Sequence, residues 1–131
     1  MPFSPTKQIR LHAENCLECG RCVRECSFLQ KYGSPKAIAA SWQPNTPSGQ
    51  RLPFSCSLCG LCAAVCPSET GLNPAAMFLE MRQQLVKNGT APFPEHQGIL
   101  AYERRGISNL YSHFALPKNC NTVLFPGCTF T

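Results

Sequence analysis

The sequence contains neither a long hydrophobic run nor a run of basic residues. Its N-terminus, residues 1–7, lacks the apolar core of a signal peptide. No segment approaches the roughly 20 consecutive apolar residues that a membrane span needs. Disulfides are rare in reducing compartments, so cysteines in a chain without an export signal are available as metal ligands. We therefore expect a cytoplasmic protein with no membrane span of its own, peripheral to a membrane complex only through partners.

The sequence also lacks a cluster of basic residues and a recognisable set of catalytic residues. The 12 basic and 7 acidic residues give a formal net charge of +5. The basic residues are scattered rather than gathered in a patch, so no nucleic-acid partner is expected. The sequence shows no combination of an acid, a base and a nucleophile that is typical of a catalytic site. We expect no bond-making or bond-breaking chemistry from this chain alone.

Cysteine, in contrast, is abundant, with ten in the chain. Eight of them form two copies of the motif C-x-x-C-G-x-C-x-x-x-C, and 29 residues separate the copies. The cysteines of the first copy are Cys16, Cys19, Cys22 and Cys26, and those of the second are Cys56, Cys59, Cys62 and Cys66. Zinc usually takes its four ligands as two distant pairs, and a redox dithiol needs only one pair. Two evenly spaced four-cysteine runs therefore favour iron–sulfur clusters.

The spacing also predicts which cysteines share a cluster. Two-residue gaps let a loop wrap around one [4Fe–4S] cluster and supply three ligands, while the fourth cysteine lies on a helix that points away. In two-cluster ferredoxins this fourth cysteine binds the other cluster. We therefore expect two [4Fe–4S] clusters with crossed ligands. The first set is Cys16, Cys19, Cys22 and Cys66, and the second set is Cys56, Cys59, Cys62 and Cys26.

The residues between the cysteines differ in the two motifs. Gly20 and Gly60 occupy the same position, where a positive φ brings backbone N–H groups close to sulfur. The remaining spacers are charged in the first motif and apolar in the second: Glu18, Arg21, Arg24 and Glu25 against Leu58, Leu61, Ala63, Ala64 and Val65. Charged side chains are costly to bury. We expect the first loop to lie near solvent, where electrons enter or leave, and the second to lie deeper. The alternative is that the apolar spacers form a docking face.

Helices are expected around both motifs. Asn73-Pro74 is a capping pair, and apolar residues at helical spacing follow it, so a helix is predicted over residues 74–87. Further helices are expected over residues 21–32, 35–40 and 96–103. Residues 43–53 are rich in Pro, Ser, Asn and Gly and are expected to form a loop. A short buried strand is expected over residues 122–125, so the fold class is mostly α with a short C-terminal β-strand.

The remaining cysteines and the histidines carry no ligand pattern. Cys120 and Cys128 are isolated, and isolated cysteines are more often small buried apolar residues than ligands. His12, His96 and His113 lack ligand spacing, and we interpret them as ordinary residues.

The motifs resemble a known module. Residues 10–90 are similar to the α-helical ferredoxin domain of succinate dehydrogenase and fumarate reductase iron–sulfur subunits and of the C subunit of heterodisulfide reductase. Residues 122–128 resemble the opening of the cysteine-rich CCG domain, whose first cysteine Cys128 matches; its later paired cysteines are absent here. That domain follows a two-cluster module in the D subunit of heterodisulfide reductase, in the C subunit of anaerobic glycerol-3-phosphate dehydrogenase, and in glycolate and lactate oxidase iron–sulfur subunits.

The resemblance implies a division of the chain and a function. Residues 1–90 would form the two-[4Fe–4S] α-helical ferredoxin domain, with clusters between helices. Residues 91–119 would form a helical connector, and residues 120–131 the truncated start of a CCG-type domain. The chain would relay single electrons between a flavoprotein or heterodisulfide reductase-like subunit and other electron carriers. The alternative is a cluster-based redox or oxygen sensor.

Overall fold

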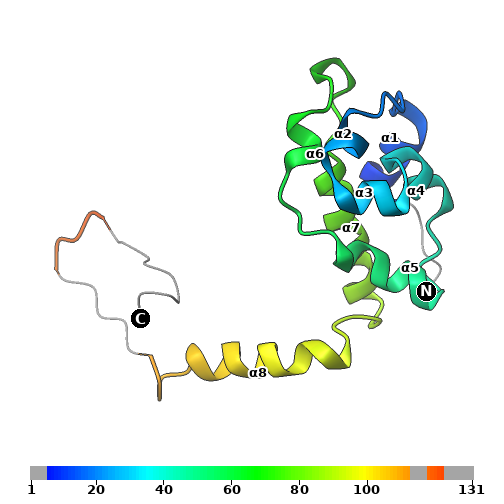
Figure 1. Cartoon of the computed structure of the whole chain (residues 1–131). Coiled ribbons are helices and arrows are strands. Elements are labelled where there is room, and N and C mark those ends of the chain that lie inside the picture. Colours follow the sequence, from blue (N-terminus) through cyan, green and yellow to red (C-terminus); the bar gives the residue numbers. More distant parts are fainter. Residues whose placement is uncertain (1–5, 113–117, 123–131) are drawn as a thin grey trace. The chain divides into compact units, whose positions relative to one another are not determined.

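The computed structural model describes residues 6–112 and 118–122. Within these residues all regular secondary structure is helical, which confirms the prediction of a mostly α-helical fold (Figure 1). The expected C-terminal strand falls on residues 123–125, which lie outside the described residues, and Thr122 belongs to no helix or strand. The chain divides into two compact units, Met1–Phe93 and Pro94–Thr131.

Helices follow one another closely along both units. Those of the first unit are α1 (Lys7–Asn15), α2 (Arg21–Glu25), α3 (Ser27–Tyr32), α4 (Pro35–Ser41), α5 (Pro47–Arg51), η1 (Leu52–Ser55), α6 (Leu61–Ala64), η2 (Ser68–Thr70) and α7 (Pro74–Lys87). Those of the second unit are η3 (Pro94–His96) and α8 (Gln97–Gly106). The elements marked η are single 3-10 turns.

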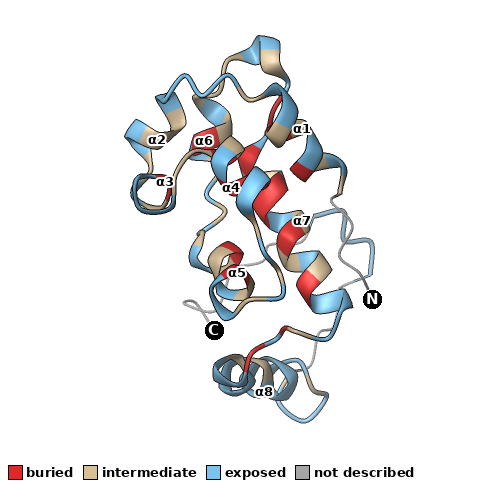
Figure 2. Cartoon of the chain, turned by 90° about the vertical axis from the view of Figure 1, so that its right-hand side faces the viewer, coloured by how far each residue is buried: buried red, intermediate tan, exposed pale blue. Residues whose placement is uncertain are grey.

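Helix α7 is the support of the first unit. It begins as predicted, with Pro74 at its first position and the Asn73 side chain accepting a hydrogen bond from the Ala76 N–H at 3.1 Å. Besides Pro74, four larger apolar side chains of the helix are fully buried, and the buried residues mark a stripe along it in Figure 2: Met77, Phe78, Met81 and Leu85. Burying each contributes about 1.5–3 kcal/mol to stability. Helices α1 and α6 and the turn η1 all pack against α7.

Helix α1 has no counterpart among the predicted elements. Its N-terminus is capped from α7, because the Glu80 carboxylate accepts hydrogen bonds from the Thr6 hydroxyl and from the Gln8 N–H, the latter at 3.0 Å. A carboxylate there satisfies free N–H groups and complements the helix dipole. The cap comes from a residue more than 70 positions away, so the local sequence does not reveal it. The spacing of Ile9 and His12, both buried, is the only local signal.

The helix predicted over residues 21–32 is interrupted at Cys26. This residue has extended backbone angles, φ −129° and ψ 113°, and separates α2 from α3. The prediction of one continuous helix is therefore wrong. The break redirects the chain so that Leu29 enters the core, where it is 1% exposed, and Cys26 lies beside cysteines of the second motif.

Residues 43–53, predicted to be a loop, contain α5 and the start of η1. The Thr46 hydroxyl accepts a hydrogen bond from the Gly49 N–H at 3.1 Å, and Pro47 occupies the first helical position. The Trp42 indole N–H donates to the Gly49 carbonyl at 2.8 Å. Proline and hydroxyl residues that favour loops also begin helices, and here the contact with Trp42 stabilises a short helix.

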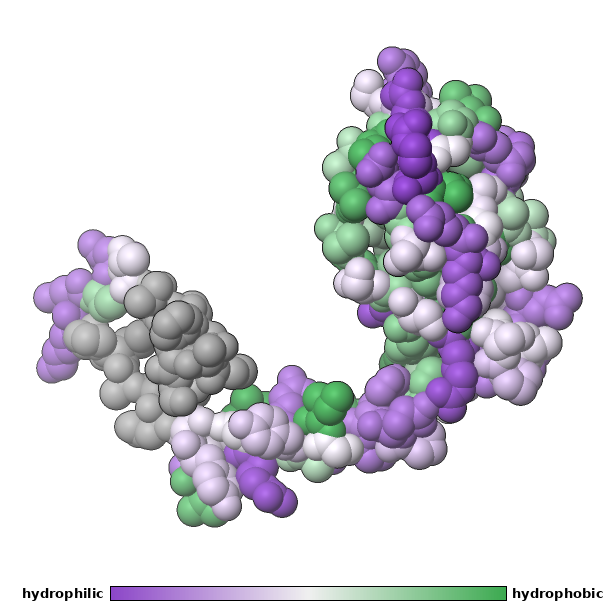
Figure 3. Space-filling view, in the orientation of Figure 1, coloured by the Kyte–Doolittle hydropathy of each residue, from purple (hydrophilic) through white to green (hydrophobic). Residues whose placement is uncertain are grey.

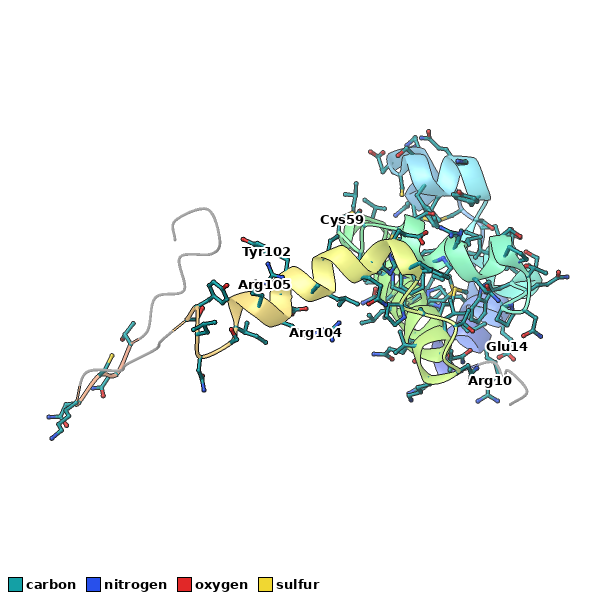
Figure 4. All side chains as sticks on the ribbon, turned by 90° about the horizontal axis from the view of Figure 1, so that it is seen from below. Arg10, Glu14, Cys59, Tyr102, Arg104 and Arg105 are labelled. Carbon is teal, nitrogen blue, oxygen red and sulfur yellow. The ribbon has the colours of Figure 1, made fainter. Side chains whose placement is uncertain are left out.

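The second unit contains a helix where one was expected. Helix α8 covers most of the predicted residues 96–103 and continues to Gly106. Hydrophobic and hydrophilic residues alternate along this segment in Figure 3, and Figure 4 labels three of its side chains, Tyr102, Arg104 and Arg105. None of the described helices in either unit has both the length and the apolar character needed to cross a membrane.

The exposure of Cys120 contradicts its interpretation as a buried apolar residue. It was expected to be buried, but it is exposed, and its Sγ lies 2.9 Å from the Thr122 carbonyl oxygen. The physical reason is that none of the described residues of the second unit, 94–112 and 118–122, is buried, so these residues form no core that could enclose the thiol. Cys128 and His113 lie outside the described residues.

Candidate iron–sulfur centres

Each cysteine motif folds as a tight loop that leads into a short helix. The two loops repeat the same backbone conformation, with positive φ at Glu18 (50°) and Leu58 (56°), and again at Gly20 (75°) and Gly60 (79°). Positive φ is uncommon for residues other than glycine. Its recurrence at matching motif positions shows that the two loops share one geometry.

This geometry brings backbone donors to sulfur. In the second loop the Leu58 N–H donates a hydrogen bond to the Cys56 sulfur at 3.4 Å. Hydrogen bonds to cysteine sulfur stabilise negative charge at an iron–sulfur site and are one of the means by which proteins set its potential.

Two hollows bring the eight motif cysteines together in two groups of four. The first hollow is lined by Cys16, Cys19, Cys22 and Cys66, and the second by Cys26, Cys56, Cys59 and Cys62. Each group contains the first three cysteines of one motif and the last of the other. Packing of α2 against α6 produces this exchange.

The groups do not resemble a site for a single metal ion. Within residues 6–112 and 118–122, no three His, Cys, Asp or Glu side chains converge closely enough to hold one ion. A [4Fe–4S] cluster makes a different demand, because each of its four thiolates binds a separate iron atom. The donor set around each hollow, four cysteine thiols, fits such a cluster.

The pKa values of the thiols reflect the same groups. Burial raises the pKa of the Cys62 thiol to about 11, and charge on Cys56 adds to the rise, with smaller contributions from Cys26 and Cys22. Burial also raises the pKa of Cys22, and the other cysteines of the first hollow add to that rise. Cys62 belongs to the buried core cluster and Cys22 packs against the same cluster, so the two groups are neighbours. Iron binding must therefore displace protons from buried thiols.

Cys59 differs from its group, because it lies exposed at the surface (Figure 4). Hydrogen bonding to the Leu61 N–H, and then to the Ser57 side chain, lowers the pKa of the Cys59 thiol. Each group thus combines inner and outer cysteines, since Cys19 of the first group is exposed as well.

The two loops differ in depth, largely as their spacers predict. Glu18 and Gly20 are exposed, whereas the matching Leu58 and Gly60 are half-buried. Cys22 is half-buried, whereas Cys62 is 7% exposed. The expectation fails at Leu61, which remains 43% exposed, and at Ala64, which is exposed.

The second hollow rests on the core. Ala75 and Phe78 of α7 line it, together with Phe28 and Leu29 of α3. The Phe28 and Phe78 rings meet edge to face with centroids 5.1 Å apart. This packing holds Cys26 close to the loop of the second motif, because Cys26 directly precedes the helix that carries Phe28.

Two polar side chains, Thr70 and His12, lie at the first hollow. The Cys66 sulfur lies 3.3 Å from the Thr70 hydroxyl, and His12 of α1 also lines this hollow. The His12 Nδ1–H donates to the Gln8 carbonyl at 2.7 Å, while Nε2 is buried with no partner among the described residues.

His12 is a site residue that the sequence interpretation missed. It is 0% exposed, and burial lowers its pKa, although the Gln8 carbonyl and the Glu80 carboxylate oppose this effect. A single histidine four residues before Cys16 belongs to no ligand motif, so only its position in the folded chain identifies it.

Known proteins support this description of the cysteine groups. Residues 15–70 match the family described as a 4Fe-4S dicluster domain. The chain carries an iron–sulfur electron-transfer module. Over an alignment of 156 positions, gaps included, it is 23% identical to the D subunit of dihydromethanophenazine:CoB–CoM heterodisulfide reductase from Methanosarcina acetivorans and 22% identical to the same protein from Methanosarcina mazei. Each alignment covers 91% of this chain.

A second kind of relative has the same module. The B subunit of fumarate reductase (CoM/CoB) from Methanothermobacter marburgensis is 24% identical over 110 residues, which cover 74% of this chain and 22% of that relative. The chain spans 38% of the length of the two heterodisulfide reductase subunits. No solved structure matches it.

Proposed function

We propose that the chain holds two [4Fe–4S] clusters with crossed ligands and relays single electrons within an oxidoreductase complex. Cys16, Cys19, Cys22 and Cys66 would hold one cluster, and Cys26, Cys56, Cys59 and Cys62 the other. Each bound cluster supplies a site that accepts and gives up one electron without making or breaking a covalent bond. The chain's own residues hold the two sites side by side and shield their inner thiolates from water.

One observation carries this proposal. The folded chain groups the cysteines four and four, and each group draws its fourth member from the other motif. Chance placement of eight cysteines would not produce two groups that each contain the first three cysteines of one motif and the last cysteine of the other. The matching loop backbones and the match to a 4Fe-4S dicluster domain over residues 15–70 support the same assignment.

The partner would be a flavin-dependent dehydrogenase subunit or a heterodisulfide reductase-like subunit. Relatives of this chain are subunits of heterodisulfide reductase and fumarate reductase, and the chain spans well under half of each. The exposed first loop, with Cys19 and Glu18 at its surface, would be the side at which electrons are exchanged with that partner.

Anaerobic reconstitution with iron and sulfide tests the proposal. We expect about eight iron and eight sulfide per chain, and stepwise reduction followed by EPR should reveal two one-electron centres. Zinc at one or two atoms per chain with no sulfide would contradict the proposal. A chain that binds iron but undergoes no reversible reduction would refute the relay and leave the metal site standing.

A further inference from the structure

Arg82 ties helix α7 to the beginning of the second cysteine loop. Its Nε donates a hydrogen bond to the Pro53 carbonyl at 2.9 Å, and its Nη2 donates to the Cys56 carbonyl. The guanidinium also lies over the Phe54 ring, with 5.3 Å between its central carbon and the ring centroid. Three contacts therefore hold one cation at the first ligand of the second site.

This cation has no carboxylate to neutralise it. Within the residues that the structure describes, no acidic side chain forms an ion pair with Arg82, and the residue is half-buried. Its charge acts on the site itself, because the guanidinium is hydrogen-bonded to the backbone carbonyl of the ligand Cys56.

The first site has no matching cation. The charged residues that line its hollow are Glu18 and Arg21. They have opposite signs and are both exposed, so solvent and salt screen them. The two sites therefore have the same loop conformation but differ in their electrostatic environment.

The geometry points to Arg82 as a positioning residue of the second iron–sulfur site that raises the reduction potential of its cluster. The inference rests on the proposed function. An oxidised [4Fe–4S] site with four thiolates carries a charge of 2−, and one added electron makes it 3−. A fixed cation stabilises the more negative state more strongly, so it raises the reduction potential.

Three variants of the reconstituted full chain test this role, with the two midpoint potentials followed by EPR. In Arg82→Gln we expect the equilibrium constant for reducing the second cluster to fall about tenfold, which is 59 mV for a one-electron couple, with no change at the first. Arg82→Lys keeps the charge and should keep the potential. Lys87→Gln, which removes an exposed cation five residues along the same helix, should change neither potential. Cys59→Ser identifies the signal of the second site.

The outcomes separate the inference from the function beneath it. If the unmodified chain binds no iron and sulfide, the proposed function fails. If both clusters form but Arg82→Gln shifts neither potential, or shifts both equally, the role of Arg82 is wrong. If Arg82→Gln loses the second cluster, Arg82→Lys decides: an unchanged potential supports the effect of charge, and a lost cluster or lowered potential overturns it.

Discussion

The loops that carry the two cysteine groups have the same backbone conformation, but the residues packed around them differ. Both loops use positive φ at the same two positions and lead into a short helix through a glycine. The second group lies against α7 and aromatic rings, whereas the first lies beside His12 and Thr70 with its loop exposed. A repeated motif therefore specifies how cysteines are presented, while the helices packed around it determine how each group differs. Four changes to the chain test how far this contrast extends.

The largest expected effect comes from exchanging one crossed ligand for serine. Cys26→Ser should remove about half of the bound iron and expose Cys56, Cys59 and Cys62 to alkylation in the iron-loaded chain. Cys66→Ser is the matched variant and should instead expose the cysteines of the first motif. Mass spectrometry of the alkylated peptides reports which cysteines react. If Cys26→Ser exposed Cys16, Cys19 and Cys22, each motif would hold its own cluster and the crossed assignment would be wrong.

A substitution in the core of α7 should affect the second cysteine group more than the first, because α7 packs against the second hollow. Phe78→Ala removes a fully buried ring that lines the second hollow, and we expect it to lower the free energy of unfolding by about 3–5 kcal/mol. The second cluster should be lost before the first when iron content is followed during urea titration. Leu79→Ala changes the next residue of α7, which is 45% exposed, and should cost under about 1 kcal/mol. Equal loss of both clusters in Phe78→Ala would show that α7 supports the two sites alike.

Because the two loops have the same backbone conformation, substituting the matching glycines should lower the stability of the chain by equal amounts. A Cβ added at Gly20 or Gly60 would meet nothing within 4 Å, and both residues have positive φ. The cost of Gly20→Ala and of Gly60→Ala is therefore that of left-handed backbone alone, about 1–2 kcal/mol each. Chemical denaturation of the metal-free chain measures it. A difference well above the error would mean that the deeper position of the second loop matters to its backbone.

The smallest effect is a pH dependence that belongs to the first group. Unfolded His12 titrates near 6.5, and burial lowers its pKa in the folded chain. Between the two values the unfolded chain binds a proton that the folded chain does not, so stability decreases as the pH falls below about 6.5. The slope is at most about 1.4 kcal/mol per pH unit. Denaturation of the metal-free chain between pH 7.5 and 5 should show this loss, and His12→Gln should reduce it. His96→Gln is the control, and the same reduction there would exclude His12 as the cause.

Several features of this protein follow from the sequence by itself. The repeated motif identifies the eight cysteines, and its glycines predict the positive φ that both loops adopt, because these are local backbone requirements. The Asn73-Pro74 and Ser34-Pro35 pairs predict the starts of α7 and α4, and both side chains accept the expected capping hydrogen bonds. Such signals are legible because the interacting residues lie within one turn of each other.

Only the tertiary structure reveals the neighbours that make the two sites unequal. Glu80 caps α1, His12 reaches the first hollow and Arg82 binds the carbonyls of the second loop. These contacts join residues up to 74 positions apart, and no motif links the residues that they join. The break at Cys26 has the same origin, since a run that favours helix locally is divided where Leu29 enters the core. Local propensity specified the segments, and the packing of α7 against α1, α6 and η1 decided what surrounds each cysteine.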